Sequence, residues 1–430
     1  MKTKPDLSFS SLWNLSFGFF GVQIAYALQS ANISRIFSTL GADPHNLSYF
    51  WLLPPIAGLI IQPIIGTLSD RTWCRFGRRL PYLILGAIMA VIVMALLPNA
   101  GSFHFAVSGA LIFGAFSLMF LDLSINISMQ PFKMLVGDMV NEKQKGLAYS
   151  IQSFLCNAGS VVGYVFPFLL TWIGISNIAE GNKVPDSVSF SFYLGAAILI
   201  LCVIYTFWKV KEMPPKVYAE YHGITEECDN KKENIFTLLV KAPKVFWTVG
   251  LVQFFCWGAF MYMWTYTTGG VAEQAFGWHN ADGTQVESYQ MAGNWTGLLF
   301  AVQAIGSVIW AAVLPFIPNR KFAYSLSLVI GGIGFITSKY LLFLSFFLVG
   351  TAWAAMLAMP FTILTNSISG KHMGAYLGLF NGTITIPQIV AAALGGVIFS
   401  LLGGVYQINM IGLAGVLLII GAICVAFVHE

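Results

Sequence analysis

The sequence predicts an all-α polytopic membrane protein with twelve transmembrane helices in two six-helix bundles. Hydrophobic residues make up 57% of the 430 residues and charged residues only 9%, whereas soluble domains average about 25% charged residues. The apolar runs are long and continuous, which argues against the alternating pattern of a β-barrel. Since a transmembrane helix needs about 20 apolar residues, a chain of this length holds about twelve spans joined by short loops.

The continuous apolar runs place these spans along the chain. Several runs exceed the length that a bilayer of about 30 Å requires, so we expect those helices to tilt or protrude. The expected spans lie near residues 13–37, 47–68, 80–98, 104–137, 144–173, 189–209, 244–270, 289–315, 321–338, 340–367, 373–402 and 405–428.

One long charged segment, KVKEMPPKVYAEYHGITEECDNKKEN, separates the sixth span from the seventh. Its Pro-Pro pair and mixed charges are typical of a linker with a short surface helix. We therefore expect an N-terminal six-helix bundle (1–210), a cytoplasmic linker (211–243) and a C-terminal six-helix bundle (244–430). Such a repeat places a transport pathway between its halves. The alternative is that this segment is an ordinary cytoplasmic loop.

Basic residues gather in the loops on one side of the membrane. The N-terminal segment, the second-to-third loop, the fourth-to-fifth loop and the central segment hold most of the lysines and arginines, whereas the opposite side has only Arg35, Lys183 and Lys339. By the positive-inside rule, both termini are therefore cytoplasmic. We expect a multi-pass protein of the cell membrane, specifically a bacterial inner membrane.

The segment LMFLDLSINISMQPFKMLVGDMV, residues 118–140, is apolar enough to span a bilayer but carries Asp122 near its middle. A carboxylate at that depth costs several kcal/mol unless it is protonated, paired or hydrated. Asn126 and Lys133 follow at helical spacing, so the three side chains point within about 40° of one face. We predict that this face lines a cavity and that Asp122 is functional. The alternative is a neutral structural residue that is hydrogen-bonded between helices.

Polar and aromatic side chains also follow helical spacing in other spans. Each stripe alone is typical of contacts between helices, but together they predict a wet, amide-rich, aromatic-lined cavity. Amides offer donors and acceptors, and aromatic faces suit sugar rings. An anionic substrate would require basic residues in the spans, where only Lys133 qualifies. The predicted substrate-binding residues are Gln23, Tyr26, Gln29, Asn126, Ser153, Asn157, Gln253, Trp257, Trp264, Asn294, Asn381, Thr385 and Gln388.

Motifs in both halves carry a family resemblance. GTLSDRTWCRFGRRLP, residues 66–81, resembles the second-to-third loop signature of the major facilitator superfamily, with the extra residues found in plant sucrose/proton symporters and their animal and bacterial relatives. Similar motifs of that family match GVQIAYALQ, WLLPPIAGLIIQPIIGTLSDR, LDLSINISMQPFKMLVGD and GAYLGLFNGTITIPQIV. The resemblance covers most of the chain and is stronger in the N-terminal half.

The resemblance implies the major facilitator fold and a sugar:proton symporter that works by alternating access. Its substrate would be a neutral disaccharide or glycoside, sucrose- or maltose-like, and the family's proton-coupling carboxylate falls on Asp122. The sequence departs from the family in two places. Lys133 replaces the usual Arg after the fourth-span Pro and cannot form a bidentate fork. The seventh span, WGAFMYMWTYTTGGVAEQAFG, is more similar to bacterial glycoside transporters than to plant sucrose carriers.

Charged residues at the expected cytoplasmic helix ends predict a gate. Ion pairs and helix dipoles there can hold one conformation closed, and the alternative is positive charge that serves topology alone. Glu273, near the outer end of the seventh span, is a candidate for an outer gate or a cation site. The predicted cytoplasmic gate comprises Asp70, Arg71, Arg78, Arg79 and Asp138.

Other functions remain open at this point. One is a sodium-coupled glycoside symporter in which Asp122 and Asn126 supply oxygen ligands; another is a proton-coupled efflux carrier for small organic molecules. A receptor is a further alternative. The six cysteines are scattered, and we find no nucleophile–base pair, phosphate-binding glycine loop or metal-ligand cluster. We therefore expect no enzyme activity, cofactor, metal or nucleic-acid partner, and we expect a monomer in the lipid bilayer.

Overall fold

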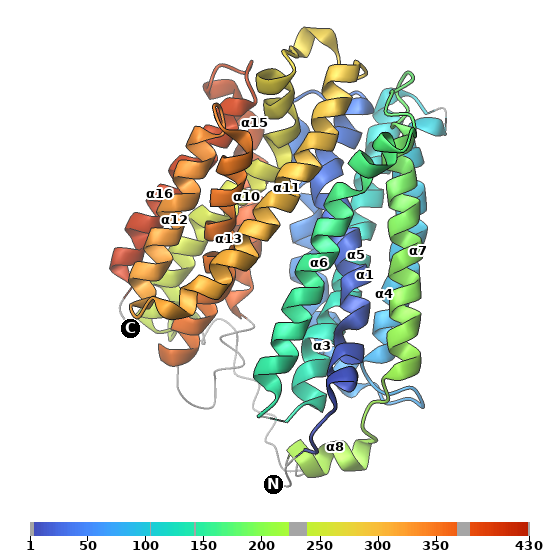
Figure 1. Ribbon diagram of the computed structural model, residues 1–430, viewed down its shortest axis with the longest axis vertical. Coiled ribbons are helices and arrows are strands. Elements are labelled where there is room, and N and C mark those ends of the chain that lie inside the picture. The colour runs from blue at the N-terminus through green and yellow to red at the C-terminus, as the bar shows by residue number, and fades with distance from the viewer. Residues whose placement is uncertain (1–3, 104, 142, 223–238, 368–378, 429–430) are drawn as a thin grey trace.

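The chain folds into two bundles of long helices that lie side by side (Figure 1). The computed structural model describes residues 4–103, 105–141, 143–222, 239–367 and 379–428. Nine helices in this described part are long and apolar enough to cross a membrane. The fold class predicted from the apolar runs is therefore confirmed, and the protein is a multi-pass membrane protein.

The N-terminal bundle begins with a helix that spans most of the height of the molecule. After its last long helix a short helix, α8 (Pro215–His222), lies across the end of this bundle (Figure 1). The other elements are α1 (Phe9–Thr39), α2 (Leu47–Phe50), α3 (Leu53–Arg71), α4 (Leu80–Leu96), the 3₁₀ turn η1 (Leu97–Ser102), α5 (Val107–Met139), α6 (Lys145–Trp172) and α7 (Asp186–Lys209).

The C-terminal bundle has the same up-and-down course. Its elements are α10 (Lys244–Ala275), the 3₁₀ turn η2 (Asn280–Asp282), α11 (Glu287–Val313), the 3₁₀ turn η3 (Leu314–Phe316), α12 (Arg320–Thr337), α13 (Leu342–Ser367), α15 (Gly382–Leu401), α16 (Ile408–Cys424) and the 3₁₀ turn η4 (Val425–Phe427).

The second expected span is not one continuous helix, because α2 ends at Phe50 and α3 begins only at Leu53. Pro54 and Pro55 explain the break. Proline lacks a backbone N–H and is tolerated in the first turn of a helix but not in its interior, so the two prolines start a new helix. The interruption leaves Trp51 in the turn between the two helices. The expected start of the eleventh span, at residue 373, lies outside the described residues.

Helix α1 occupies the centre of the molecule. It packs against α5, α6 and α7 in its own bundle and against α10 and α11 in the other. From Gly21 to Leu40 every residue except Tyr26 is buried. Because protein surrounds this stretch, it can carry many amide and hydroxyl side chains that would be costly against lipid.

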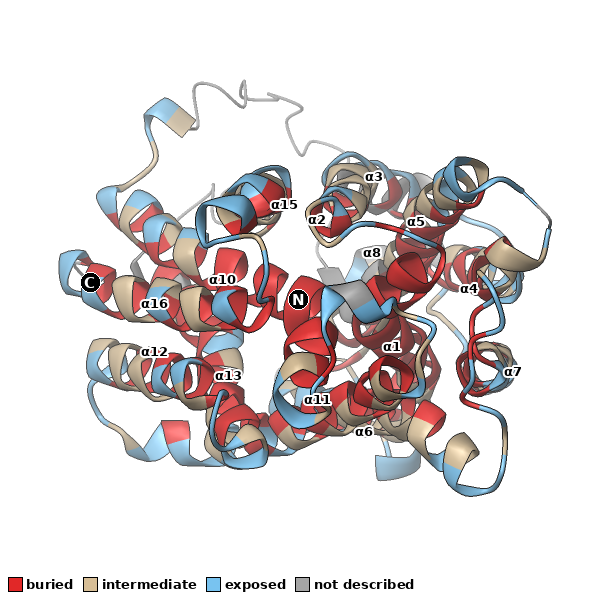
Figure 2. Cartoon of the chain, turned by 90° about the horizontal axis from the view of Figure 1, so that it is seen from above, coloured by how far each residue is buried: buried red, intermediate tan, exposed pale blue. Residues whose placement is uncertain are grey.

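The two bundles meet mainly at the end of the molecule away from both termini, which we call the far end. There α6 packs against α11, and α2 and α3 pack against α15. A Cβ on Gly297 of α11 would lie only 2.2 Å from the carbonyl oxygen of Tyr164 on α6, so glycine permits this close approach. Figure 2 shows buried residues concentrated where the bundles face each other. Toward the termini the two ribbons diverge (Figure 1).

Candidate functional site

The side chain of Asp122 lies in the middle of α5 and is held by two amide groups. Gln29 Nε2, on α1, donates to Asp122 Oδ1 over 3.1 Å, and Asn126 Nδ2, one turn along α5, donates to Oδ2 over 2.8 Å. Asp122 is only 9% exposed. The structure therefore brings together three residues that the sequence analysis selected from two different spans, although their roles remain predictions.

The electrostatic setting of Asp122 consists of neutral groups. Among the residues that the structure describes, no lysine or arginine forms an ion pair with it. The side chain of Lys133, predicted on the same face, lies outside the described part. Amide N–H donors favour an ionised carboxylate, and hydrophobic burial opposes it. Among the described residues, these two opposing effects act on the charge of Asp122.

Gln29 can serve either protonation state of Asp122. Its Oε1 is buried and accepts no hydrogen bond among the described residues. An amide carries a donor and an acceptor of nearly equal shape. Rotation of the Gln29 amide would turn Oε1 toward Asp122, where it could accept a hydrogen bond from a neutral carboxyl group. Tyr26, one turn earlier on α1, lies near both Asp122 and Tyr164.

Aromatic side chains form a second cluster beside the contact between the bundles. Trp257 and Trp264 of α10 pack around Trp353 of α13, with ring centroids 5.8 and 6.0 Å apart. Trp51 of the N-terminal bundle stacks on Trp264 at 6.1 Å. The indole N–H of Trp257 is buried and donates no hydrogen bond among the described residues, so it is available to a ligand acceptor.

Sequence reasoning found Trp257 and Trp264 but missed Trp51 and Trp353. Both missed residues lie in apolar runs, and Trp51 stands in the family-like WLLPP motif. An indole N–H inside a span is the signal that could have identified them, because such a group requires an acceptor. Trp51 Nε1 donates to Ser34 Oγ over 3.1 Å, and Ser34 Oγ donates to the carbonyl of Trp264 over 3.0 Å.

Several other predicted binding residues make contacts within one bundle. Gln253 is fully buried and donates to the carbonyl of Met356 over 3.1 Å, which joins α10 to α13. For Gln253 this geometry fits the alternative interpretation of the polar stripes, in which such residues make contacts between helices. Asn157 and Thr385 bond to carbonyls of their own helices. The remaining predicted residues are the half-buried Asn381 and Gln388, the exposed Ser153, and Gln23, which packs against Gly159.

Arg35 is the largest omission of the sequence analysis, which treated it as a charge at the outer surface. It is fully buried and donates to the side-chain oxygens of Asn177, Gln290 and Asn294 at 2.7–2.9 Å. Asn294, predicted to bind substrate, thus contacts Arg35 at the far end. An arginine inside the expected span 13–37 was the available signal, because intramembrane charges normally have partners within the protein.

The predicted gate residues meet at the opposite end, inside the N-terminal bundle. Asp138 Oδ2 forms ion pairs with Arg78 Nη2 at 2.7 Å and Arg79 Nε at 3.0 Å. The side chains of Asp70 and Arg71 lie outside the described part. The sequence analysis missed Tyr218 of α8, whose hydroxyl lies 2.6 Å from Arg78 Nη2 and whose ring lies 4.0 Å beneath the guanidinium.

Glu212, just before α8, was also missed. Its carboxylate accepts hydrogen bonds from the backbone N–H groups of Arg78, Arg79 and Leu80 at 2.7–3.0 Å. These N–H groups begin α4 and have no partner within the helix, and a negative charge is favourable at that position. A Cβ on Gly77 would lie 2.6 Å from Glu212 Cδ, and Gly77 has a φ of +106°, so glycine is required at this turn.

Glu273 has a similar structural role in the C-terminal bundle. It accepts hydrogen bonds from the N–H groups of Gln407 and Ile408, at 2.8 and 3.1 Å, at the start of α16.

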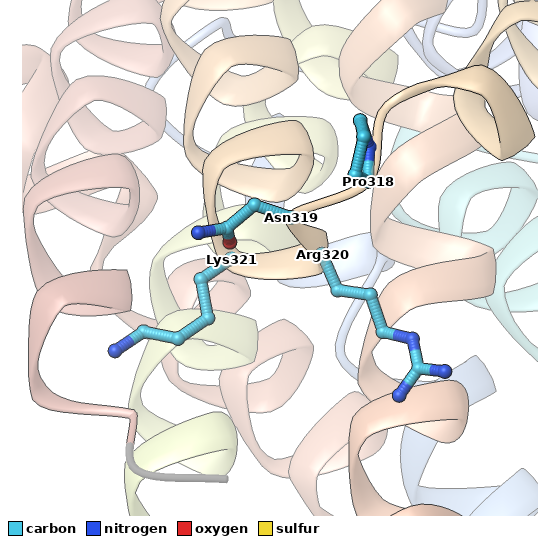
Figure 3. A pocket seen from close by; sticks show the side chains of 4 residues that line it. All are labelled: Pro318, Asn319, Arg320 and Lys321. Carbon is cyan, nitrogen blue, oxygen red and sulfur yellow. The ribbon is translucent and has the colours of Figure 1, made fainter.

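A shallow surface pocket at the turn between α11 and α12 is lined by Pro318, Asn319, Arg320 and Lys321 (Figure 3). It contains none of the predicted binding residues. Within the described ranges no group of three or more His, Cys, Asp or Glu residues is arranged to hold a metal.

Comparison with known proteins places this geometry in a family. The chain is 23% identical to the sucrose transport protein SUC4 of Arabidopsis thaliana over 423 residues, covering 89% of this chain and 83% of the relative. It is 25% identical to the sucrose transport protein SUT1 of Oryza sativa subsp. japonica over 473 residues, covering 95% and 85%. The fold resembles a crystal structure of the nucleoside transporter NupG (D323A mutant), with a TM-score of 0.70, 12% identity and coverage of 98% and 99%. The family model of the Major Facilitator Superfamily matches residues 15–293. This chain belongs to the major facilitator superfamily.

Proposed function

We propose that the protein is a sugar:proton symporter that imports a neutral disaccharide or glycoside and uses Asp122 as its proton-coupling group. The observation that carries this proposal is the Asp122 site itself. Among the described residues, the partners of this buried carboxylate in the middle of a membrane helix are neutral amides, from α1 and from α5. A carboxyl group whose described partners are all neutral is suited to gain and lose a proton during a transport cycle.

The transport cycle follows from the two protonation states of Asp122. When the site opens to the outside, Asp122 takes up a proton and becomes a hydrogen-bond donor. The neutral carboxyl group then donates to a sugar hydroxyl or to Gln29 Oε1. Binding of both ligands permits the N-terminal half (1–210) to move against the C-terminal half (244–430). Loss of the proton on the inner side restores the amide-bonded carboxylate and weakens sugar binding.

We further propose that both termini are cytoplasmic, because basic residues gather in the loops on that side. The far end is then the outer face of the membrane. The close contacts of α1, α6 and α11 at the far end correspond to a conformation that is closed to the outside. Alternating access requires these contacts to part in every cycle.

The sugar class is supported by the relatives and by the free hydrogen-bonding capacity near the contact between the bundles. Two relatives are named as sucrose transport proteins. Gln29 offers a buried acceptor, and Trp257 offers a buried donor, for which the described residues provide no partner. Sugar hydroxyls can satisfy both groups, and aromatic faces suit the apolar faces of sugar rings. Sucrose-like and maltose-like substrates both fit this chemistry.

We propose a proton rather than sodium as the coupling ion, on the basis of the hydrogen bonds that Asp122 accepts in this conformation. A sodium site requires several oxygen ligands that converge on one point. At Asp122 the neighbouring amides present their nitrogen atoms, which donate hydrogen bonds to the carboxylate.

Efflux of lipophilic cations is less consistent with a site so rich in amides. One chain contains both halves, so we propose that the monomer in a lipid bilayer is sufficient for transport.

Purified protein in sodium-free proteoliposomes tests this function. A pH-sensitive dye inside the vesicles should report acidification when sucrose, maltose or a related disaccharide is added outside. Counterflow of labelled disaccharides identifies which sugars are carried. Sugar uptake that requires added sodium and moves no protons would support the sodium-coupled alternative instead. Transport of lipophilic cations without sugar transport would support the efflux alternative.

A further inference from the structure

We propose that Arg35, Asn177, Gln290 and Asn294 form a latch between the two halves at the far end, and that Arg35 is its positioning residue. This Arg35 latch sets how often the protein opens at that end. The proposal depends on the proposed function in one respect: the two halves must separate at the far end during transport.

The guanidinium of Arg35 joins elements from both bundles. Its Nη2 donates to Asn177 Oδ1, in the loop after α6, over 2.7 Å. Its Nε donates to Gln290 Oε1 over 2.8 Å, and its Nη1 donates to Asn294 Oδ1 over 2.9 Å. Gln290 and Asn294 lie one turn apart on α11 of the other bundle. Three nitrogen atoms of one planar group therefore each bind a different amide, which suits the fixed geometry of arginine.

The two accepting amides on α11 are held in place by their own N–H groups. Gln290 Nε2 donates to Thr39 Oγ1 over 2.9 Å and to the carbonyl of Thr284 over 2.7 Å. Asn294 Nδ2 donates to Thr171 Oγ1 over 2.9 Å. These bonds turn the amide oxygens toward Arg35. Since Thr39 and Thr171 belong to the N-terminal bundle, the contacts cross between the halves in both directions.

Steric fit supports the same assignment independently of the hydrogen bonds. A Cβ added to Gly293, between Gln290 and Asn294 on α11, would lie 2.4 Å from Arg35 Cδ. The side chain of Arg35 therefore fills the space that the missing side chain of Gly293 provides. Because residue 293 is a glycine, α11 can pack directly against an arginine of the opposite half.

The absence of a carboxylate among the described partners of Arg35 explains why a latch at this position can reopen. Separation of a buried arginine–carboxylate pair leaves two uncompensated charges. When amide oxygens are the acceptors, separation leaves one charge, on Arg35, and neutral amides that water can satisfy at the outer surface. On opening, Arg35 would lose its bonds to Gln290 and Asn294 and retain the bond to Asn177, which belongs to its own half. Arg35 therefore stays oriented for the next closure.

Accessibility of a cysteine next to the latch, near the far end of α1, measures opening directly. Ser38, on α1 and 4% exposed, is replaced by cysteine in the full-length chain. Alkylation by a membrane-impermeant maleimide is then followed in sealed right-side-out and inside-out vesicles. The parent protein without Ser38→Cys gives the background from native cysteines. The vesicle orientation that reacts reports which membrane face the far end occupies, and this readout needs no sugar.

Three variants of the latch should change the alkylation rate in predicted directions. Arg35→Gln should raise the rate roughly a hundredfold, because two charge-assisted hydrogen bonds between the halves are lost, each worth about tenfold. Arg35→Lys should give an intermediate rate, because an ammonium group keeps the charge but cannot reach three amides. Asn294→Asp should lower the rate below that of the parent, because an ion pair replaces a neutral acceptor and the Thr171 hydroxyl can turn to donate.

A matched control keeps the test specific. Lys183→Gln removes an exposed positive charge near the same end and should leave the rate unchanged. Size-exclusion chromatography confirms that each variant is folded. The proposal is overturned if Arg35→Gln leaves the rate at the parent value, or if Asn294→Asp raises it as Arg35→Gln does. A protein that shows these rates but carries no sugar would contradict the proposed function and leave the latch intact.

Discussion

Gln29 on α1 donates a hydrogen bond to Asp122 on α5, with 3.1 Å between Gln29 Nε2 and Asp122 Oδ1. The other carboxylate oxygen accepts from Asn126 on the same helix as Asp122. Of these two bonds, only the one from Gln29 connects the acid to another helix. Because α1 also carries Arg35 six residues further on, about 9 Å along the helix axis, one helix contacts both the proposed coupling site and the Arg35 latch.

Replacement of Gln29 by Ala should slow net uptake more than exchange. The ionised form of Asp122 loses one of its two donors, so the release step that ends with ionised Asp122 becomes less favourable. Sugar exchange can proceed with Asp122 protonated throughout. We expect proton-driven uptake in proteoliposomes to fall about tenfold, as expected for one lost hydrogen bond to a charged group, with counterflow changed much less. The control is Gln23→Ala, which removes a neighbouring amide that packs against Gly159. It should change proton-driven uptake and counterflow by the same factor.

Trp257→Phe should weaken sugar binding without destabilising the protein. The indole N–H of Trp257 is buried and has no acceptor among the described residues, so its loss removes an unpaired polar group. If this N–H donates to the sugar, the apparent KM should rise roughly fivefold to tenfold, as expected for one hydrogen bond. An unchanged KM with an unchanged thermal midpoint would exclude Trp257 from the binding site. Trp353→Phe is the comparison for packing effects.

Glu212→Ala should lower stability through the start of α4. Three backbone N–H groups would lose their acceptor, and capping interactions of this kind are worth about 1 kcal/mol. We expect a lower thermal midpoint for the protein in detergent, with partial recovery in Glu212→Gln, which keeps one acceptor oxygen. Glu180→Ala, at an exposed loop position, is the control. Equal midpoints for the Glu212 and Glu180 variants would show that the cap contributes nothing.

Tyr218 provides a test by pH. Burial raises the pKa of the Tyr218 hydroxyl above its ordinary value of 10.0. A raised pKa in the folded state contributes stability that is present below the unfolded pKa and is lost as pH rises through the folded pKa. The free energy of unfolding of the wild type relative to Tyr218→Phe should therefore be constant up to about pH 9 and should fall above about pH 10. Tyr221→Phe on the same helix is the control, and a difference that varies below pH 9 would contradict the assignment.

The sequence predicted the fold and the contact between Asp122 and Asn126 because both depend on local patterns. Long apolar runs predict the spans, and an i, i+4 spacing is sufficient to place Asn126 beside Asp122. The break at Pro54 and Pro55 follows from the chemistry of proline but was not predicted. The apolar run continues through it, so hydropathy alone does not reveal the turn that contains Trp51.

The remaining contacts depend on how distant helices pack. Gln253 and Gln29 satisfy the same spacing rule, but Gln253 faces α13 of its own bundle whereas Gln29 faces Asp122. Helical periodicity identifies a polar face without identifying the neighbour that covers it. Arg35 and Asn294 are 259 residues apart, and their contact exists only where α1 and α11 close at the far end. Glu212 and Tyr218 were hidden for a similar reason, because the linker folds back onto the loop before α4.

In the proposed mechanism, Asp122 carries the proton that drives sugar accumulation. One proton moving down the membrane potential supplies about 2.3 kcal/mol per 100 mV, enough for a roughly fiftyfold concentration ratio. The most direct test compares the wild type with Asp122→Asn in proteoliposomes under an imposed potential and pH gradient. We expect Asp122→Asn to retain disaccharide counterflow and to lose accumulation completely. Accumulation by Asp122→Asn that is still abolished by an uncoupler would show that another group carries the proton.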